Sequence, residues 1–389
     1  MILRDFSLVC KAICFSGIIA TSTAIAETNL TVEEARVEKA QTALAPVFRL
    51  TRERTAAFNE QLQKARSYTA LTQVVLRHAP ALWRESVELV SERQVYEDRG
   101  LYWARLHMMN LLKKAKSFQA LLPMQQEKLI NRLERLTRGK EDVKYTQNAD
   151  KKILVTGFDP FFLDRNIAQS NPSGITALAL DNLLLSKEGI TAEIQSLMIP
   201  VRFADFDQGL IEEFLTPHMK DVDMVVTISM GRSEFDLERF PGLRRSAKAP
   251  DNLNVHTGAN KNNPIVPLLD GKPLNGPEFV EFSLPVHAMK KATGKFEVID
   301  NHQITTLEQG QFNAKSLKEL SSQTSVEGAG GGYLSNEISY RSILLRNAHN
   351  PILPVGHIHT PRISGVDSEV SKDITQQIKQ MLTQSISDI

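Results

Sequence analysis

Three segments in the carboxyl-terminal half combine residue types that could catalyse acyl transfer. The first, Gly328-Ala-Gly-Gly-Gly-Tyr-Leu-Ser335, places a hydroxyl where a glycine run meets the expected start of a helix. Glycines let a backbone approach a ligand closely, and free amides at a helix N-terminus can stabilise a developing anion. Ser335 is therefore a candidate nucleophile, although helix N-cap is the commoner role for serine at such a position.

The second and third segments supply a histidine and a carboxylate. Gly356-His-Ile-His359-Thr-Pro361 follows an apolar stretch, and on an extended chain His357 and His359 face the same side. A metal pair is conceivable, but neither a later cysteine nor a second close histidine cluster supports it. One histidine acting as general base is the more natural interpretation. Glu238 could orient it and complete a Ser–His–Glu set, so we expect no metal and no cofactor.

An aromatic loop offers a candidate binding pocket. Thr156-Gly-Phe-Asp-Pro-Phe161 follows a short apolar strand, and Phe158 and Phe161 could wall a small apolar pocket, although an isolated aromatic loop is more often part of a core. Asn171-Pro-Ser173 then begins a helix with a capping residue.

From residue 149 onward, expected strands and helices alternate, which predicts a three-layer α/β/α domain with a mostly parallel, mixed sheet. In such sheets reactive groups lie on loops at the carboxyl ends of strands. The expected strands cover 153–156, 192–201, 224–230, 296–299 and 352–358. The expected helices cover 173–186, 203–220, 286–293, a segment from 335 and one from 367.

Residues 27–148 have a different pattern, with apolar residues at three- and four-residue steps, and predict an all-helical domain joined through a polar linker at 140–150. This half contains 21 basic and 15 acidic side chains, while the remainder from 149 is net acidic. The opposite charges could favour docking of the two halves or an acidic partner, or they could be solvated helix faces.

Composition and the N-terminus exclude several classes of protein. Hydrophobic residues make up 42% and charged residues 23%, which is typical of a globular protein. A net charge of +1 argues against a nucleic-acid binder, and the absence of an apolar run of about 18 residues argues against stable membrane insertion. Residues 1–26 resemble a signal peptide ending in Ala24-Ile-Ala26. We therefore expect an exported protein, periplasmic or secreted.

Export would leave a mature chain, from Glu27 onward, without cysteine. The two cysteines are Cys10 and Cys14, both inside the predicted signal peptide. Disulfide bonds, cysteine-ligated zinc and thiol catalysis are then excluded together.

Several short motifs over residues 152–363, in the same order, resemble the pyroglutamyl peptidase I (pyrrolidone-carboxylate peptidase) family. These cysteine exopeptidases remove N-terminal pyroglutamate. The family patterns T-G-F-x-P-F…N-P-S, G-R…E-R…P-D-N, S-x-L-P-V and G-x-I-H-x-P correspond to residues 156–173, 231–252, 283–286 and 356–361. The helical half lies outside the resemblance.

The resemblance implies roles for particular residues. Glu238 and His359 occupy the positions of the catalytic glutamate and histidine. The positions that hold the lactam ring correspond to Phe158, Phe161 and Asn171.

The nucleophile region departs from the family pattern. Tyr-x-Cys-Asn-His becomes Tyr333-Leu334-Ser335-Asn336-Glu337, so serine replaces the nucleophilic cysteine. We expect Leu334, Ile228 and Lys248 to be substrate-binding residues. Ile228 replaces the glutamine that helps to recognise pyroglutamate, and Lys248 stands where an arginine is usual. An alcohol must lose its proton to an aligned base during attack, whereas a thiol ionises more readily.

Three interpretations remain open. The first is an exported serine hydrolase acting on an N-terminal, pyroglutamyl-type amide of a small peptide. The second is an inactive protein that kept the pocket and binds small peptides or lactam-like ligands, with Ile228 or Glu337 occupying catalytic space. In the third, the helical half is the functional interaction module, which predicts an exposed patch around Trp83 and Trp103. That half could also mediate contacts in an oligomer.

Overall fold

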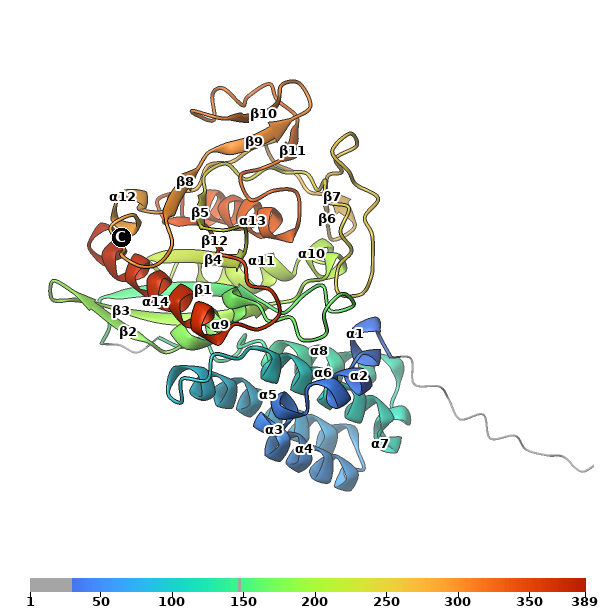
Figure 1. Ribbon diagram of the computed structural model, residues 1–389. Coiled ribbons are helices and arrows are strands. Elements are labelled where there is room, and N and C mark those ends of the chain that lie inside the picture. Colours follow the sequence, from blue (N-terminus) through green and yellow to red (C-terminus); the bar gives the residue numbers. More distant parts are fainter. Residues whose placement is uncertain (1–29, 146–147) are drawn as a thin grey trace, which may run out of the picture.

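The computed structural model describes residues 30–145 and 148–389, so the predicted signal peptide lies outside the described residues. The chain forms a helical domain followed by an α/β domain, as the sequence predicts (Figure 1). A small three-stranded sheet projects from the α/β domain on the side away from the helical domain. Among the described helices, none has the length and apolarity needed to cross a membrane.

The helical domain is built around two long helices with apolar faces. The short helix at the start of the domain, Val32–Ala35, begins with a capping box. The Thr31 side chain accepts from the Glu34 amide, and the Glu34 carboxylate accepts from the Thr31 amide. The helices are α1 (Val32–Ala35), α2 (Val37–Ala43), α3 (Ala45–Leu50), α4 (Arg52–Lys64), α5 (Tyr68–Ser91), α6 (Arg99–Lys114), α7 (Lys116–Gln119) and α8 (Pro123–Leu136). Trp83 and Trp103 are 0% exposed. The patch that the third interpretation predicts around them is therefore absent.

A seven-stranded, mostly parallel sheet forms the centre of the α/β domain, in the order β2-β3-β1-β4-β12-β5-β8. Its strands are β1 (Lys151–Phe158), β2 (Leu184–Lys187), β3 (Ile190–Ile199), β4 (Met224–Met230), β5 (Phe235–Glu238), β8 (Val298–Asn301) and β12 (Val355–Thr360). The edge strand β2 is antiparallel to β3, and β5 is antiparallel to β12. The smaller sheets are β6 (Leu268–Leu269) with β7 (Lys272–Pro273), and β9 (Gln303–Thr306) between β10 (Gly310–Asn313) and β11 (Ser325–Glu327).

Helices cover both faces of the central sheet, which confirms the predicted layers. One face carries α9 (Pro172–Leu180) and α14 (Ser368–Ser385), and the other carries α11 (Leu210–Leu215) and α13 (Leu334–His349) (Figure 1). The remaining short helices are α10 (Phe203–Asp207) and α12 (Val286–Met289), with 3-10 turns η1 (Thr216–His218) and η2 (Ile386–Asp388).

Three of the helix predictions are wrong in extent. The helix expected over 286–293 ends at Met289, as α12. The helix expected over 173–186 ends at Leu180, and the residues that follow form the edge strand β2. The helix expected over 203–220 is interrupted at Gly209, whose φ of +78° ends one helical segment and begins another. Strand pairing and a left-handed residue override an apolar spacing that fits a continuous helix.

The two domains share a hydrophobic core. Ile175 and Leu178 of α9, together with Met198 of β3, belong to the same buried cluster as the apolar side chains of α5 and α6. Helix α9 is therefore packed between the central sheet and the helical domain. This packing matters for function because the loop before α9 carries the candidate pocket residues.

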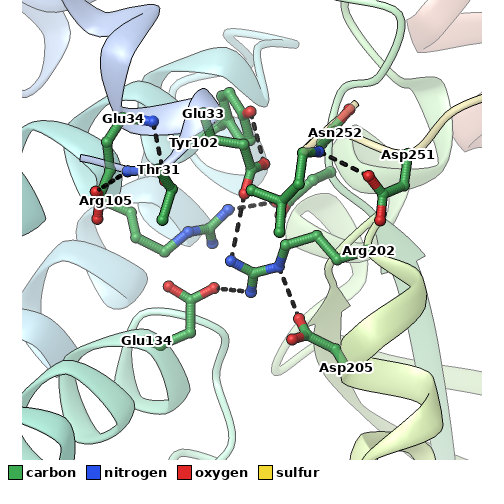
Figure 2. Close-up of polar contacts among 12 residues, drawn as sticks. Thr31, Glu33, Glu34, Tyr102, Arg105, Glu134, Arg202, Asp205, Asp251 and Asn252 are labelled. Atoms are coloured by element: carbon green, nitrogen blue, oxygen red, sulfur yellow. Dashed lines mark hydrogen bonds and ion pairs between the residues drawn. The ribbon is translucent and has the colours of Figure 1, made fainter. Parts of the chain in front are cut away.

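A buried charge network crosses the same interface (Figure 2). Arg202, after β3, ion-pairs with Glu33 of α1, with Glu134 of α8 and with Asp205 of α10. Burial raises the pKa of Glu33, and Arg202 opposes that shift. Glu134 is also paired with Arg138 at 2.6 Å, whereas Arg202 is the only ion-pair partner of Glu33 among the described residues.

Further arginines of the helical half reach acidic groups of the α/β domain. Arg105 and Arg138 both contact the Asp159 carboxylate, at 2.5 and 2.8 Å, and Arg36 contacts Asp164 at 2.6 Å. The opposite charges of the two halves thus meet within one chain, which agrees with the docking interpretation of the charge pattern.

We expect replacement of Arg202 by methionine to lower the free energy of unfolding by about 3–5 kcal/mol, because it leaves the buried Glu33 carboxylate without its ion-pair partner. Arg84→Met is the matched control: Arg84 pairs with Asp142 at 3.4 Å, its side chain is 58% exposed, and its loss should cost less than about 1 kcal/mol. Urea unfolding followed by tryptophan fluorescence measures both. Equal decreases in the free energy of unfolding for the two variants would show that the interdomain network contributes no more to stability than a surface ion pair.

Candidate active site

His359 and Glu238 come together because their strands are neighbours. In the antiparallel pairing of β12 with β5, His359 lies opposite Asp236, and Glu238 is two residues further along β5 on the same face. The His359 Nδ1 lies 2.5 Å from the Glu238 Oε1. The second Glu238 oxygen accepts a hydrogen bond from the Asn301 amide at 2.9 Å. Both carboxylate oxygens of Glu238 are thus held, and the imidazole orientation is fixed through Nδ1.

Burial controls the electrostatics of this pair. Glu238 is 0% exposed, and burial raises its pKa above the ordinary 4.5, while the neighbouring His359 acts in the opposite direction. Burial likewise raises the pKa of Asp236, and Arg232 opposes the shift. The result is a carboxylate whose charge is stabilised mainly by the imidazole beside it, an arrangement suited to stabilising an imidazolium.

Ser335 lies in the first turn of α13. The N-cap of this helix is Tyr333, so Ser335 is inside the helix and is not its cap. The Ser335 Oγ donates to the Gly330 carbonyl at 3.1 Å. Within residues 148–389, no hydrogen bond joins Ser335 to His359. Ser335 belongs to the first turn of α13, and a helix leaves its initial N–H groups without intrahelical acceptors.

The glycine run packs the backbone closely beneath Ser335. A Cβ on Gly328 would lie 2.1 Å from the Asn336 Oδ1, and Gly331 has a φ of +84°. Gly328 to Gly331 form a tight turn whose backbone lines the cleft in front of Ser335. The glycines therefore permit both the turn and the close approach that the sequence indicates.

Ser335 lies where two cavities meet. A small pocket of about 40 Å³ is lined mostly by apolar side chains and includes Phe158, Phe161, Asn171, Leu334 and Ser335. A larger cleft of about 450 Å³ contains both Ser335 and His359. The predicted pocket residues are thus brought together beside the predicted nucleophile.

The larger cleft has a more polar outer wall. Its members beyond the glycine turn include side chains from the projecting sheet and nearby loops: Arg232, Lys261, Gln303, Thr305, Gln311, Glu327 and Arg362. The site therefore combines a small apolar pocket with a larger, more polar cleft, and Ser335 lines both. Such a shape suits a short peptide that places one end in the pocket.

The helical domain holds the loop that forms the small pocket. Asp98, at the start of α6, accepts from the Ser170 hydroxyl at 2.5 Å and from the Asn171 amide at 2.9 Å. Burial raises the pKa of Asp98 to about 7. The Asn171 side chain caps α9 and donates to the Asp159 carbonyl at 3.0 Å. Asn171 lines the pocket, while its amide mainly stabilises the loop.

Three residues singled out in the sequence lie outside the site. Ile228 is 0% exposed in the core of the sheet and lines neither cavity, because the alternation of β4 turns it to the face opposite Ser229. Lys248 points to solvent, and its neighbours Ala247 and Ala249 line the cleft instead. Glu337 forms ion pairs with Arg245 and Arg341 and does not occupy the cleft. Placing Ile228 and Lys248 in the binding site is therefore a prediction that the structure corrects.

Two polar residues near the pocket were missed. Ser229 lines the small pocket, and its Oγ lies 2.7 Å from the Nε2 of His357. His357 is 0% exposed, and burial lowers its pKa well below the ordinary 6.5. Strand alternation could have found them, since residues 227 and 229 of one strand and residues 357 and 359 of the other share one face.

Asp236, Glu238 and His359 also form a cluster whose ligand atoms all lie within 4.8 Å of one another. Carboxylate and imidazole groups at this spacing could hold a divalent metal. In this structure, however, the Nδ1 of His359 and the Oε1 of Glu238 are engaged with each other at 2.5 Å. The geometry therefore corresponds to a hydrogen-bonded histidine–carboxylate pair.

The comparisons with known proteins cover both domains. Residues 19–134 match the model of the PA0049 N-terminal domain, and residues 152–272 and 295–364 match the model of the PA0049 C-terminal domain. The chain thus resembles PA0049 in both of its domains. The uncharacterized protein PA0049 of Pseudomonas aeruginosa is 28% identical over 389 residues, covering 76% of this chain and 70% of that protein.

The α/β domain is also similar in sequence to pyrrolidone-carboxylate peptidases. The protein of that name from Levilactobacillus brevis is 27% identical over 210 residues, covering 54% of this chain and 81% of the relative. The Streptococcus suis protein is 24% identical over 213 residues, covering 54% of this chain and 77% of the relative. This similarity confirms the family resemblance of the sequence motifs.

Solved structures include similar chains. A mutant pyrrolidone carboxyl peptidase from Pyrococcus furiosus matches with a TM-score of 0.42 and 21% identity, covering 61% of this chain and 99% of that chain. Pyroglutamyl peptidase I from Bacillus amyloliquefaciens matches with a TM-score of 0.40 and 19% identity, covering 61% of this chain and 98% of that chain.

Proposed function

We propose that the protein is an exported serine hydrolase that removes a small, pyroglutamyl-type N-terminal residue from a short peptide. The observation that carries this proposal is the buried His359–Glu238 pair opening onto the same cleft as Ser335, beside the small apolar pocket. The sequence similarity to pyrrolidone-carboxylate peptidases supports the same class of reaction.

In the proposed reaction His359 acts as the base. Its Nδ1 is bound to Glu238, and in the described part of the chain its Nε2 has no hydrogen-bond partner. Ser335 and His359 line the same cleft, and the proposed reaction requires the Ser335 hydroxyl to turn from the Gly330 carbonyl toward this nitrogen. The Ser335 Oγ then attacks the carbonyl carbon of the substrate amide, and its proton passes to His359.

The remaining steps return the enzyme to its starting state. The tetrahedral oxyanion is held by the first-turn amides of α13. The C–N bond breaks, and the leaving amine takes the proton from His359. A water molecule, deprotonated by His359, then attacks the Ser335 ester; the acid is released, and the proton returns to Ser335. Glu238 stabilises the imidazolium in both halves of the reaction.

A second candidate function is binding without turnover. The hydrogen bond from the Ser335 Oγ to the Gly330 carbonyl, in place of one to His359, favours it. In that case the pocket and cleft hold a small peptide or lactam-like ligand, and the Ser335 hydroxyl stays on the glycine turn.

An assay on protein recovered after export separates these functions. We expect residues 27–389 in the periplasmic fraction or the medium, with a mass showing cleavage after Ala26, and faster release of a fluorophore from a pyroglutamyl-amide than from an alanyl-amide. Unchanged rates in EDTA would agree with a metal-free reaction. Binding of both compounds without turnover would support the second candidate, and an uncleaved N-terminus would contradict export.

A further inference from the structure

A hydrogen-bonded row of side chains ends in the small pocket and has no role in the proposed mechanism. Thr227 and Ser229 of β4 project from the same face as His357 of the neighbouring strand β12. The His357 Nδ1 lies 2.8 Å from the Thr227 Oγ1, and its Nε2 lies 2.7 Å from the Ser229 Oγ. The imidazole therefore bridges two hydroxyls, and the outer one lines the pocket.

His357 is not suited to act as a second base. Its ring is completely buried and stays neutral, because burial and the nearby His359 both lower its pKa. Both of its nitrogens are already engaged with hydroxyls, and among residues 148–389 no carboxylate is hydrogen-bonded to it. A neutral, fully engaged imidazole positions Ser229 rather than activating it as a nucleophile.

Ser229 keeps hydrogen-bonding capacity for a ligand. If the Nε2 of His357 carries the ring proton, it donates to Ser229 and leaves the serine hydroxyl free to donate. If Nδ1 carries the proton, Ser229 donates to Nε2 and its oxygen lone pairs remain free to accept. Ser229 can therefore meet either an N–H or a C=O group in the pocket.

The other walls of the pocket provide few competing polar groups. Besides Ser229 and the proposed nucleophile Ser335, the lining contains mainly aromatic and aliphatic side chains, and the Asn171 side-chain Oδ1 already accepts from the Ser173 amide and hydroxyl. A buried hydroxyl among apolar walls discriminates strongly, because a ligand without a matching polar group leaves it unpaired.

We propose that Ser229, positioned by His357, is the polar specificity determinant of the small pocket and selects a lactam or similarly small amide over an apolar ring of the same size. This inference rests on the proposed function for the identity of the site. It also accounts for Ile228: the strand turns that residue into the core, and the next residue supplies the pocket with a hydrogen-bonding group.

The test compares two ligands with rings of the same size in binding and in turnover. Pyroglutamamide carries the lactam group, and cyclopentanecarboxamide has a five-membered ring without it. In the Ser335→Ala background, calorimetry should show tighter binding of pyroglutamamide, and Ser229→Ala should reduce the ratio of the two affinities by about 10- to 100-fold. Thr227→Val, which leaves the pocket lining unchanged, should also reduce the ratio of the two affinities, but by less than Ser229→Ala does. Ser342→Ala, on α13 away from both cavities, is the control.

The outcomes separate this inference from the proposed function. Lactam discrimination that depends on Ser229 but occurs without turnover in the unmutated protein supports the inference and contradicts hydrolysis. If Ser229→Ala hydrolyses its substrate with an unchanged preference for the lactam, the result contradicts the inference but agrees with the proposed hydrolysis. Equal affinity for the two ligands, or binding of neither, also contradicts the inference. Circular dichroism of each variant checks that the fold is retained.

Discussion

Replacement of Ser335 by alanine should reduce kcat/KM for the hydrolysed amide by about 10⁴-fold or more, since no other group could form the acyl intermediate in this mechanism. Steady-state assays with the pyroglutamyl-amide measure the loss. Ser342→Ala is the matched control, because Ser342 lies on the same helix, is buried, and donates only to the Ser339 carbonyl at 2.9 Å. Its activity should remain near that of the unmutated protein.

A cysteine at the same position gives a sharper test of the nucleophile. Residues 27–389 contain no cysteine, so the thiol of Ser335→Cys would be the only one in a protein that begins at residue 27. We expect this variant to hydrolyse the amide and to lose activity on alkylation, because a thiol reaches its nucleophilic form more readily than an alcohol. An alanine variant that retains more than about a tenth of the activity would contradict the assignment of Ser335 as nucleophile.

The structure explains which features the sequence could predict. The layers and the helical half follow from local patterns. The meeting of Glu238 with His359 was implied only by the family resemblance, since residues 235–238 were not among the expected strands and β5 pairs antiparallel with β12. The edge strand β2 was predicted as a helix, since Leu184 to Lys187 form a strand only through pairing with β3. That pairing is a local hairpin whose two-residue turn, Glu188 and Gly189, has positive φ at both positions, and the apolar spacing obscured this turn signal.

The pocket shows the same distinction at the level of side chains. Phe158, Phe161 and Leu334 were predicted and line it, whereas Ile228 was predicted and does not. One position along β4 reverses the face, so motif matching alone misplaces a polar contact that belongs to Ser229. Asp98 of the helical domain fixes the pocket loop by hydrogen bonding. No local sequence pattern predicts this contact, because residues 98 and 171 are far apart in the chain.

Replacement of Glu238 by glutamine should lower kcat by about 10³- to 10⁴-fold while preserving the shape of the site. Glutamine has one oxygen where glutamate has two, and both positions now accept hydrogen bonds, from His359 and from Asn301. If the glutamine oxygen faces Asn301, its NH₂ donates to the His359 Nδ1 and fixes the proton on Nε2, the nitrogen needed as base. If the glutamine oxygen faces His359, the glutamine NH₂ and the Asn301 NH₂ face each other, and neither can accept a hydrogen bond. Either arrangement disables or strains the pair.

The pH profile distinguishes this electrostatic role from a purely structural one. Burial raises the pKa of Glu238, so on acidification the unmutated pair should gain a proton, and activity should fall, at a pH above the ordinary 4.5 of glutamate. In Glu238→Gln the fall of activity on the acid side of the pH profile should move to lower pH. The variant has no buried negative charge that favours protonation of the pair. Asp300→Asn is the control, since Asp300 binds Arg239 at 2.6 Å and lines neither cavity. An unchanged acid limb in Glu238→Gln would assign Glu238 to packing alone, because only a charge that stabilises the imidazolium changes the pH at which the base is protonated.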